Sequence, residues 1–591
     1  MIRNLHQHPM KTAPISIAIA TSAGLAVAAP AATSLVAFGW EFSRKSVRDL
    51  VAIAEALDKT PLDGIGVYLN EPAEDGGMLS THTIMREAWR RETLEPLVPV
   101  VHELTAHRSM RESFIGTFRA PWGARIEWDD DASWARIASN MEIAAWFARE
   151  GGFRGLSMDP EDYHGTGQFR RRPDDPPYDA LREAARRRGR EVFEGVFREY
   201  PDIRILSFWL LSTGQRGFGM GDLADAARET GDLWPAFVDG ILDVMPPTAR
   251  LIDGCEHAYR YESARGDFWR AGDAIRRRLP ALLAPENRAK YAAQVGVSFG
   301  IYLDMFTNPE GSSWFAGPVD GSRLRHLERN VFQASEAADG YVWLWGEKHC
   351  WGDWGAEGPD AKRGISPQSW GQALPGLEDV LLAIKDPAAY AARREDALCA
   401  EGRWTPLNAN PECGGDTGDV PTPYEPWQHT KSRQGRLWRD ETCGEGDTSC
   451  LAAEGCENGA FSVNVAQPLL AGDRLLVRAS MRGEGGSAQF CWKRADGAWD
   501  WDVLQPVRLR FGPPDADGWR RGEAVVRVPE GAAGAGLILS VRQLPDEICR
   551  FDNVEIHALG YDVNHEIHET HEESLPSNLS RNAADGEPGE R

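Results

Sequence analysis

Residues 151–169 read GGFRGLSMDPEDYHGTGQF, and a short apolar run in this stretch ends abruptly in Asp159, Glu161, Asp162 and Tyr163. A short apolar run bounded by turn residues is typical of a buried β-strand. Three carboxylates and a tyrosine at the very end of such a strand need an explanation. The pattern of the rest of the chain supplies one.

Runs of this kind recur between residue 34 and about residue 397, and helical patterns separate them. In the intervening segments, apolar residues recur every three and four positions, as on one face of a helix. The eight runs are SLVAFGW from 34, DGIGVYL from 63, ESFIGTF from 112, FRGLSMD from 153, IRILSFWLL from 203, ARLIDG from 249, GVSFGIYLD from 296 and YVWLWGE from 341. Strict alternation of eight strands and helices predicts an α/β fold, a (β/α)8 TIM barrel over residues 33–397. A doubly wound open sheet is the alternative.

Polar and aromatic residues follow several of these strands. In a (β/α)8 barrel the carboxyl ends of the strands form the active-site face. Asp159 and Glu161 are two residues apart, so they point the same way if the strand continues through them. We therefore expect one rim of carboxylates and aromatic side chains, which also includes Trp40, Glu41, Asp253, Glu256, His257, Tyr259, Asp304, Trp345, Glu347, His349 and Trp351.

Some of these residues also have a structural explanation. A lone carboxylate after a strand often caps a helix or forms a salt bridge in a loop, and this applies to Asp162, Asp253 and Asp304. Glu161 and Glu256 are the stronger candidates, because each is flanked by an aromatic residue and a second polar group.

The composition limits the classes of function. The chain has 591 residues, of which 42% are hydrophobic, enough for two or three domains with proper cores. Its 65 basic and 89 acidic residues give a formal net charge of -24, which argues against nucleic acid or an anionic membrane as a partner. The 22 tryptophans suggest flat apolar surfaces on which sugar rings stack.

These features together favour the hydrolysis of glycosidic bonds. That reaction uses two carboxyl groups, one protonated and the other ionised. The chain has no evident metal cluster, no Ser-His-Asp order and no cofactor motif, so we expect neither a metal nor a cofactor. We expect Glu161 as general acid/base, Glu256 as nucleophile or second carboxylate with Glu347 in reserve, and Asp159 tuning Glu161. The expected substrate-binding residues are Trp40, Glu41, Tyr163, His257, Tyr259, Asp304, Trp345, Glu347 and Trp351.

The predicted barrel resembles the (β/α)8 glycoside hydrolases. GLSMDPEDY is similar to the D-x-E ending of chitinase-like barrels, which implies that Asp159 orients Glu161, the acid. The stretch departs from that family, because Tyr163 is one residue too far along and Gly155 and Ser157 replace the upstream aspartates. Barrels of the α-galactosidase type carry their acids on strands four and six, which here implies Asp159 or Glu161 with Glu256.

The last third of the chain has a different pattern. Residues 398–424 form a Pro/Gly-rich linker, and residues 425–558 are all β. This segment ends in FDNV followed by alternating apolar residues and resembles the jelly-roll carbohydrate-binding modules of bacterial glycosidases. The resemblance implies glycan binding by exposed aromatic residues, with a purely structural sandwich as the alternative; the candidates are Trp492, Trp499, Trp501 and Trp519. Residues 559–591 are predicted to be a polar, disordered tail.

The N-terminal residues 1–32 have the pattern of a signal peptide, with basic residues before a small-residue apolar stretch. This pattern predicts a secreted or periplasmic protein; a buried N-terminal helix is the alternative. No other run is long and apolar enough to span a membrane. Seven of the nine cysteines lie from Cys399 onward, which favours disulfides in that part of the chain.

The sequence thus predicts an exported enzyme that degrades a poly- or oligosaccharide. The rival hypothesis is a non-catalytic glycan-binding or surface protein that keeps the barrel as a scaffold. A third hypothesis, a polysaccharide lyase, needs a charge neutraliser beside a uronate, and the acidic rim argues against it.

Overall fold

The computed structural model describes residues 33–560 with several gaps. The gaps are residues 73–77, 82–83, 122, 218–221, 262–265, 353, 355–364, 409–419, 421–422, 447–448, 466, 502 and 543–546. The predicted signal peptide, most of the predicted tail and part of the predicted linker lie outside the described residues.

The eight predicted runs form the eight strands of a closed, all-parallel barrel, so the predicted fold class is confirmed. Around the barrel the strand order is β1-β10-β9-β8-β7-β6-β5-β2. These strands are β1 (Ser34–Gly39), β2 (Gly64–Val67), β5 (Phe114–Arg119), β6 (Gly155–Asp159), β7 (Arg204–Ser207), β8 (Arg250–Asp253), β9 (Val295–Tyr302) and β10 (Tyr341–Gly346). Because all eight run in one direction, their carboxyl ends share one rim.

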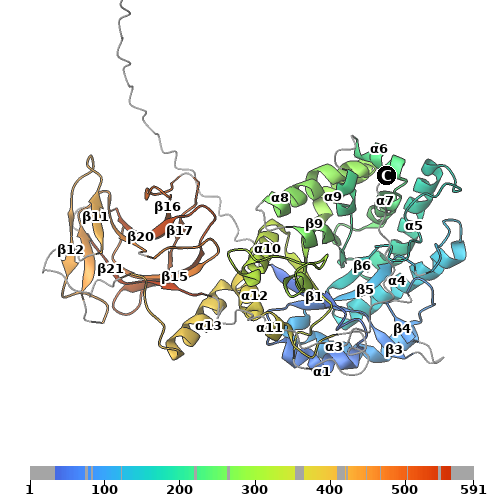
Figure 1. The fold of residues 1–591 in the computed structure, drawn as a ribbon, viewed down its shortest axis with the longest axis horizontal. Coiled ribbons are helices and arrows are strands. Elements are labelled where there is room, and N and C mark those ends of the chain that lie inside the picture. The colour runs from blue at the N-terminus through green and yellow to red at the C-terminus, as the bar shows by residue number, and fades with distance from the viewer. Residues whose placement is uncertain are drawn as a thin grey trace, which may run out of the picture. The chain divides into compact units, whose positions relative to one another are not determined.

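Helices surround the strands on the outside of the barrel (Figure 1). The helix α4 shows why they form: Asp130 caps its first turn, and Gly152 ends it in the left-handed conformation, at φ 77°. The helices are α1 (Val47–Leu57), α2 (Arg91–Leu94), α3 (Val98–Thr105), α4 (Asp131–Gly151), α5 (Tyr178–Glu199), α6 (Leu223–Thr230), α7 (Trp234–Val244), α8 (Gly266–Asp273), α9 (Pro285–Gln294), α10 (Arg323–Ala337), α11 (Trp370–Ala373), α12 (Leu377–Lys385) and α13 (Pro387–Ala400).

Aromatic side chains fill the barrel beneath its rim. Trp343 of β10 is fully buried and stacks on Phe208 with the ring centroids 4.2 Å apart. Phe38 of β1 meets both rings edge to face. The Trp343 indole Nε1 donates to the carbonyl of Gly254, just after β8, at 2.7 Å. Gly300 of β9 leaves the space for Trp343, since a Cβ there would lie 2.6 Å from its ring.

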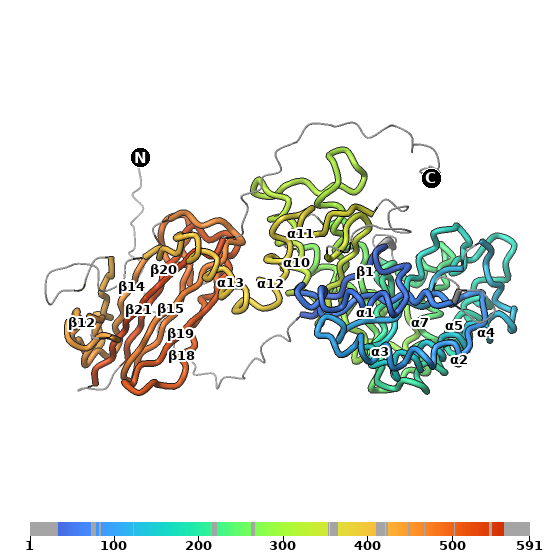
Figure 2. Tube along the Cα trace, turned by 90° about the horizontal axis from the view of Figure 1, so that it is seen from below, coloured from blue at the N-terminus to red at the C-terminus, as the bar shows by residue number. Residues whose placement is uncertain are grey.

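The remaining strands form two antiparallel sheets whose facing side chains make a second core, a β-sandwich. Figure 2 shows several of them running side by side in orange and red. One sheet has the order β11-β14-β20-β16-β17 and the other β12-β13-β21-β15-β19-β18. These strands are β11 (Glu425–Gln428), β12 (Arg436–Asp440), β13 (Cys450–Glu454), β14 (Gly459–Asn464), β15 (Arg474–Arg482), β16 (Gly486–Lys493), β17 (Val507–Arg508), β18 (Arg510–Phe511), β19 (Trp519–Arg527), β20 (Gly534–Val541) and β21 (Ile548–Ala558); β3 (Asn70–Pro72) and β4 (Met78–Ser80) pair separately.

The four tryptophans proposed for glycan binding divide into two classes. Trp492 and Trp519 are both buried, and Trp492 belongs to the core of the sandwich. Trp501 is 54% exposed, and its ring centroid lies 6.1 Å from that of the half-buried Trp499.

The expectation of disulfides is wrong for the described cysteines of the last third, which are all free thiols. The strand register keeps Cys549 and Cys450 apart. Cys549 of β21 lies opposite Ala453 of β13, three residues along the strand from Cys450. Burial raises the pKa of both Cys450 and Cys549 to about 12, so these thiols are unreactive. Cys413 lies outside the described residues. Among the described helices, none is long and apolar enough to cross a membrane.

Gly300→Ala should destabilise the barrel, because the new Cβ meets the rings of Trp343 and Tyr259 at 2.6 and 2.7 Å. Overpacking of this kind costs about 1–3 kcal/mol in the free energy of unfolding. Gly296→Ala on the same strand is the matched control, since its Cβ has no neighbour closer than 3.4 Å. Denaturant unfolding of the two variants measures the difference; equal midpoints would contradict this account of the barrel interior.

Candidate active site

The end of β6 carries a carboxylate that is paired inside the barrel mouth. Asp159 is buried, and its Oδ2 accepts a hydrogen bond from Arg119 Nη2, at the end of β5, at 3.1 Å. Its Oδ1 accepts from the backbone N–H of Glu161 at 3.3 Å. Burial raises the pKa of Asp159, although the Arg119 charge acts against this. Asp159 therefore shapes the turn that presents Glu161.

Asp162 and Tyr163 complete this turn in different ways. Asp162 accepts hydrogen bonds from the backbone N–H groups of Thr166 and Gly167 at 2.9 and 2.5 Å, so it holds the loop together, as its structural explanation predicts. The Tyr163 ring is 58% exposed. Desolvation and the nearby charges of Asp159, Glu161 and Glu256 raise the pKa of its hydroxyl, which keeps it a hydrogen-bond donor.

A sharp turn after β8 presents Glu256. Cys255 adopts the left-handed conformation, at φ 43°, and Asp253 accepts from its backbone N–H at 3.1 Å. Asp253 also accepts from Ser212 N–H and Oγ at 2.8 and 2.6 Å, so it is a buried structural group. Glu256 follows at the start of the helical turn η4 (Glu256–Arg260).

Glu256 has a strongly perturbed carboxyl. Burial first, and then the charges of Asp159 and Glu161, raise the pKa of Glu256 to about 9, against a hydrogen bond with the Trp209 side chain that lowers it. The carboxyls from β6 and β8 are thus close enough to interact electrostatically. At neutral pH Glu256 holds a proton.

Glu347, after β10, is held by three groups. Its Oε2 accepts from the Tyr302 hydroxyl at 3.0 Å, and its Oε1 accepts from the Trp345 indole at 2.9 Å. Its backbone N–H donates to Asp304 Oδ2 at 2.8 Å. These contacts orient the Glu347 carboxylate on the rim.

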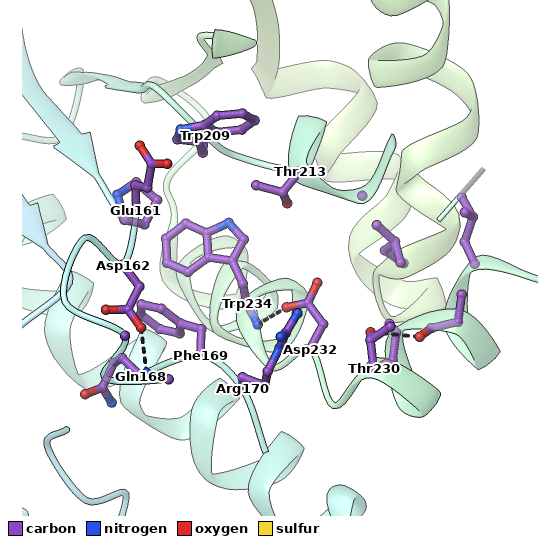
Figure 3. A pocket seen from close by; sticks show the side chains of 18 residues that line it. Glu161, Asp162, Gln168, Phe169, Arg170, Trp209, Thr213, Thr230, Asp232 and Trp234 are labelled. Carbon is purple, nitrogen blue, oxygen red and sulfur yellow. Dashed lines mark hydrogen bonds between the residues drawn. The ribbon is translucent and has the colours of Figure 1, made fainter. Parts of the chain in front are cut away.

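Two cavities lie against the loop that follows β6. The first, which we call the Trp345 cavity, has a volume of about 590 Å³. The residues around it include Trp40, Tyr68, Arg119, Asp159, Tyr163, Phe208, Trp345 and Glu347. The second, the Trp234 cavity, has a volume of about 620 Å³ and takes Pro160, Glu161 and Asp162 from the same loop. Figure 3 shows it with Glu161 and Trp209 near one another and Asp232 and Arg170 farther along.

The predicted substrate-binding residues are divided between the cavity surface and the interior. Trp40, Tyr163, Trp345 and Glu347 line the Trp345 cavity. Tyr259 and His257 line neither cavity; Tyr259 packs on Tyr302 and His257 on Trp209, with ring centroids 5.4 and 4.4 Å apart.

Three of the predicted residues are buried structural groups. Asp304 is fully buried, and its carboxylate holds the Glu347 backbone. Glu41 is 3% exposed and accepts from the backbone N–H of the buried Trp351 at 2.9 Å. None of these three residues lines either of the two cavities, so the expectation that they contact substrate stays a prediction.

The sequence prediction missed Arg119, Tyr68 and Trp209. Each follows or ends a barrel strand, so the rule that polar residues at strand ends mark the site would have found Arg119. Tyr68 and Trp209 were assigned to the strands themselves, but β2 ends at Val67 and β7 at Ser207.

No group of three or more His, Cys, Asp and Glu side chains within the described residues is arranged to hold a metal ion. The chemistry that the rim itself offers is that of carboxyl groups in unequal environments, framed by aromatic side chains.

Comparisons with known proteins reveal distant structural likenesses. No family model and no curated protein match the chain. The enzymatically active domain of tailspike protein 4 from bacteriophage CBA120 is 12% identical over 23% of this chain and 19% of that chain, with a TM-score of 0.20. The CBM22-1 xylan-binding domain from Paenibacillus barcinonensis Xyn10C is 10% identical over 26% of this chain and 96% of its own, at 0.20.

The arabinose-bound MgGH51 α-L-arabinofuranosidase is 8% identical over 26% of each chain, with a TM-score of 0.19. Glycoside hydrolases and carbohydrate-binding modules are thus among the distant structural neighbours of this chain. At these scores the likenesses carry no information on its substrate or its reaction.

Glu256→Gln should change the pH dependence of stability. The pKa of Glu256 is about 9 in the folded protein, above its ordinary 4.5, so unfolding releases a proton between these pH values. The free energy of unfolding of the wild type therefore falls as the pH rises through this window, by up to about 1.4 kcal/mol per pH unit. The variant has no proton to release there.

Denaturant unfolding at about pH 5, 7 and 9 tests this linkage. The free energy of unfolding of Glu256→Gln relative to that of wild type should increase with pH. Glu310→Gln, which changes an exposed residue, should keep a constant difference from wild type at all three pH values. Parallel curves for Glu256→Gln would show that the Glu256 pKa is not raised.

Proposed function

We propose that this protein is a glycoside hydrolase that cleaves O-glycosidic bonds of a poly- or oligosaccharide with Glu256 and Glu161. One observation carries the proposal: the carboxyls from the ends of β6 and β8 interact on the rim of a (β/α)8 barrel, and burial holds Glu256 protonated. Two carboxyl groups in opposite protonation states are what glycosidic cleavage requires.

In this proposal Glu256 is the general acid. The burial of its carboxyl and the negative charges of Asp159 and Glu161 keep the proton in place until the leaving oxygen of the glycoside accepts it. Glu161 is half-buried on the wall of the Trp234 cavity and is the ionised partner, either the nucleophile or the base that activates water. These roles are the reverse of those expected from the sequence, because burial favours the neutral form at Glu256.

Asp159 and Arg119 act as positioning residues. The ion pair between them holds one Asp159 oxygen, and the other oxygen accepts from the Glu161 backbone. The Tyr163 hydroxyl is a hydrogen-bond donor to these carboxylates. This network directs Glu161 toward the same region as Glu256.

The Trp345 cavity supplies a binding surface for a sugar. Trp40 and Trp345 are both half-buried, so parts of their rings face the cavity. Glu347 and Arg119 on the same wall offer an acceptor and donors for hydroxyl groups.

We expect Glu161→Gln and Glu256→Gln each to lower kcat by about 10²–10⁴-fold, because each removes proton transfer or charge at the reacting bond. The measurement is reducing-end release from plant, algal and microbial polysaccharides. The wild-type rate should fall as the pH rises through about 9, where Glu256 ionises.

Glu310→Gln is the matched control and should retain full activity, since Glu310 is exposed and lines neither cavity. Full activity in Glu256→Gln would exclude Glu256 as the acid and make Glu347 the next candidate. A wild type that binds one of these glycans and cleaves none would favour the non-catalytic glycan-binding protein.

For the β-sandwich we propose glycan binding at Trp499 and Trp501. Trp501→Ala should weaken retention on an insoluble polysaccharide about tenfold, since an aromatic platform is lost. Hydrolysis of soluble oligosaccharides should stay unchanged. The control is Val503→Ala, because Val503 is 74% exposed and presents no ring. Equal retention of both variants would favour a structural sandwich.

A further inference from the structure

The Trp234 cavity has a wall that is built by hydrogen bonds and is independent of the carboxyls described above. The segments on either side of it join in a short antiparallel bridge between Arg170 and Asp232. Leu233 N–H donates to Phe169 O, and Arg171 N–H donates to Gly231 O, both at 2.8 Å. The wall is therefore fixed by backbone contacts.

The lining of this cavity combines aromatic rings with hydrogen-bonding groups. Phe169 and Trp234 pack edge to face, with centroids 4.7 Å apart, and Trp209 lies near Glu161 (Figure 3). Trp234 is anchored, because its Nε1 donates to Leu210 O at 2.8 Å. Phe169 is half-buried, whereas Trp209 and Trp234 expose only small parts of their rings. An apolar ring surface beside polar groups suits a pyranose or furanose ring, which has apolar faces and a polar edge.

Asp232 and Arg170 supply polar groups away from Glu161. Asp232 Oδ1 accepts from the Trp234 backbone N–H at 3.0 Å, and Arg170 is exposed nearby. Burial raises the pKa of Asp232 to about 6, against the Arg170 charge. Because Glu161, Asp162 and Asp232 outnumber this one arginine, the cavity suits a neutral chain better than a uronate or phosphate.

The two cavities share one loop. Asp159 and Tyr163 face the Trp345 cavity, whereas Pro160, Glu161 and Asp162 face the Trp234 cavity. Glu256 lines neither cavity, but its carboxyl interacts with Asp159 and Glu161 of this loop, so a bond that reacts among these groups has room for sugar on both sides. Each volume lies within the range of about 300–1,000 Å³ that is usual for small-molecule sites.

We propose that the Trp234 cavity binds the sugar units on one side of the scissile bond, so that the substrate is a neutral oligosaccharide chain that occupies both cavities. This inference rests on the proposed glycosidase function. It excludes a monosaccharide glycoside as the preferred substrate.

The test changes the Trp234 cavity and leaves Asp159, Glu161 and Glu256 intact. Leu223 is half-buried at the start of α6 and lines the cavity, so Leu223→Trp adds bulk inside it. Ala224→Trp is the matched control, since Ala224 is exposed on the same helix turn and lies outside the lining. Asp232→Asn removes a charge but keeps an oxygen that accepts from the Trp234 N–H. Its control is Asp225→Asn, because Asp225 is an exposed residue of α6. Thermal unfolding checks that all four variants fold.

The substrates are the di- and hexasaccharides of neutral β-glucan, xylan, mannan, arabinan, galactan and chitin. For the series that the wild type cleaves, kcat/KM should be higher for the hexasaccharide than for the disaccharide. Leu223→Trp should lower the hexasaccharide value about tenfold and leave the disaccharide value nearly unchanged, because only the longer chain enters the filled cavity. Asp232→Asn should act in the same direction, and the two controls should match wild type.

If Leu223→Trp lowers kcat/KM equally for the disaccharide and the hexasaccharide, or for neither, the inference is overturned and the proposed glycosidase function is unaffected. If the wild type cleaves none of these sugars, calorimetric titration with the same hexasaccharides decides. A binding site that Ala224→Trp keeps and Leu223→Trp loses would support the cavity assignment and overturn the glycosidase function. Identical binding by these two variants would overturn both.

Discussion

The hydrogen bonding of eight parallel strands into a closed barrel is the constraint on which the site depends. Closure leaves no edge strand, and the single strand direction places all eight carboxyl ends on one rim. Asp159 and Glu256 are almost a hundred residues apart in the sequence, yet they interact because β6 and β8 both end there. Trp343 stabilises this rim from below through its stacking on Phe208 and its hydrogen bond to Gly254.

Burial is the second determinant, because it separates carboxyls that look alike in the sequence. Asp253 and Asp304 are fully buried and bind backbone N–H groups, so they support the turns that present Glu256 and Glu347. Burial raises the pKa of both, to about 7 for Asp304. Glu256 is half-buried, and the hydrogen bond with the Trp209 side chain offsets only part of the rise in its pKa. Glu161 is also half-buried and lies on a cavity wall. The rim acids therefore lie in different environments, although they look alike in the sequence.

The position of the candidate site was predictable to the extent that it depends on where the barrel strands end. The runs of apolar residues located Asp159, Glu161 and Glu256, since the barrel directs every strand end to one face. The direction of the chain after each strand was not predictable. Glu41 and Trp351 turn inward and bind each other, whereas Arg119 and Tyr68, which the pattern did not single out, face the Trp345 cavity. These differences depend on contacts between residues far apart in the sequence.

The sequence by itself determined the α/β fold class, because periodicity reports which face of each segment is apolar, and eight alternating patterns favour a closed barrel over an open sheet. It also determined that carboxyls and aromatic residues would gather on one rim. Only the tertiary structure decided which carboxyl is desolvated, which is paired with Arg119 and which residues line the two cavities. Desolvation and pairing depend on the neighbours that packing brings together, and a linear pattern does not contain them.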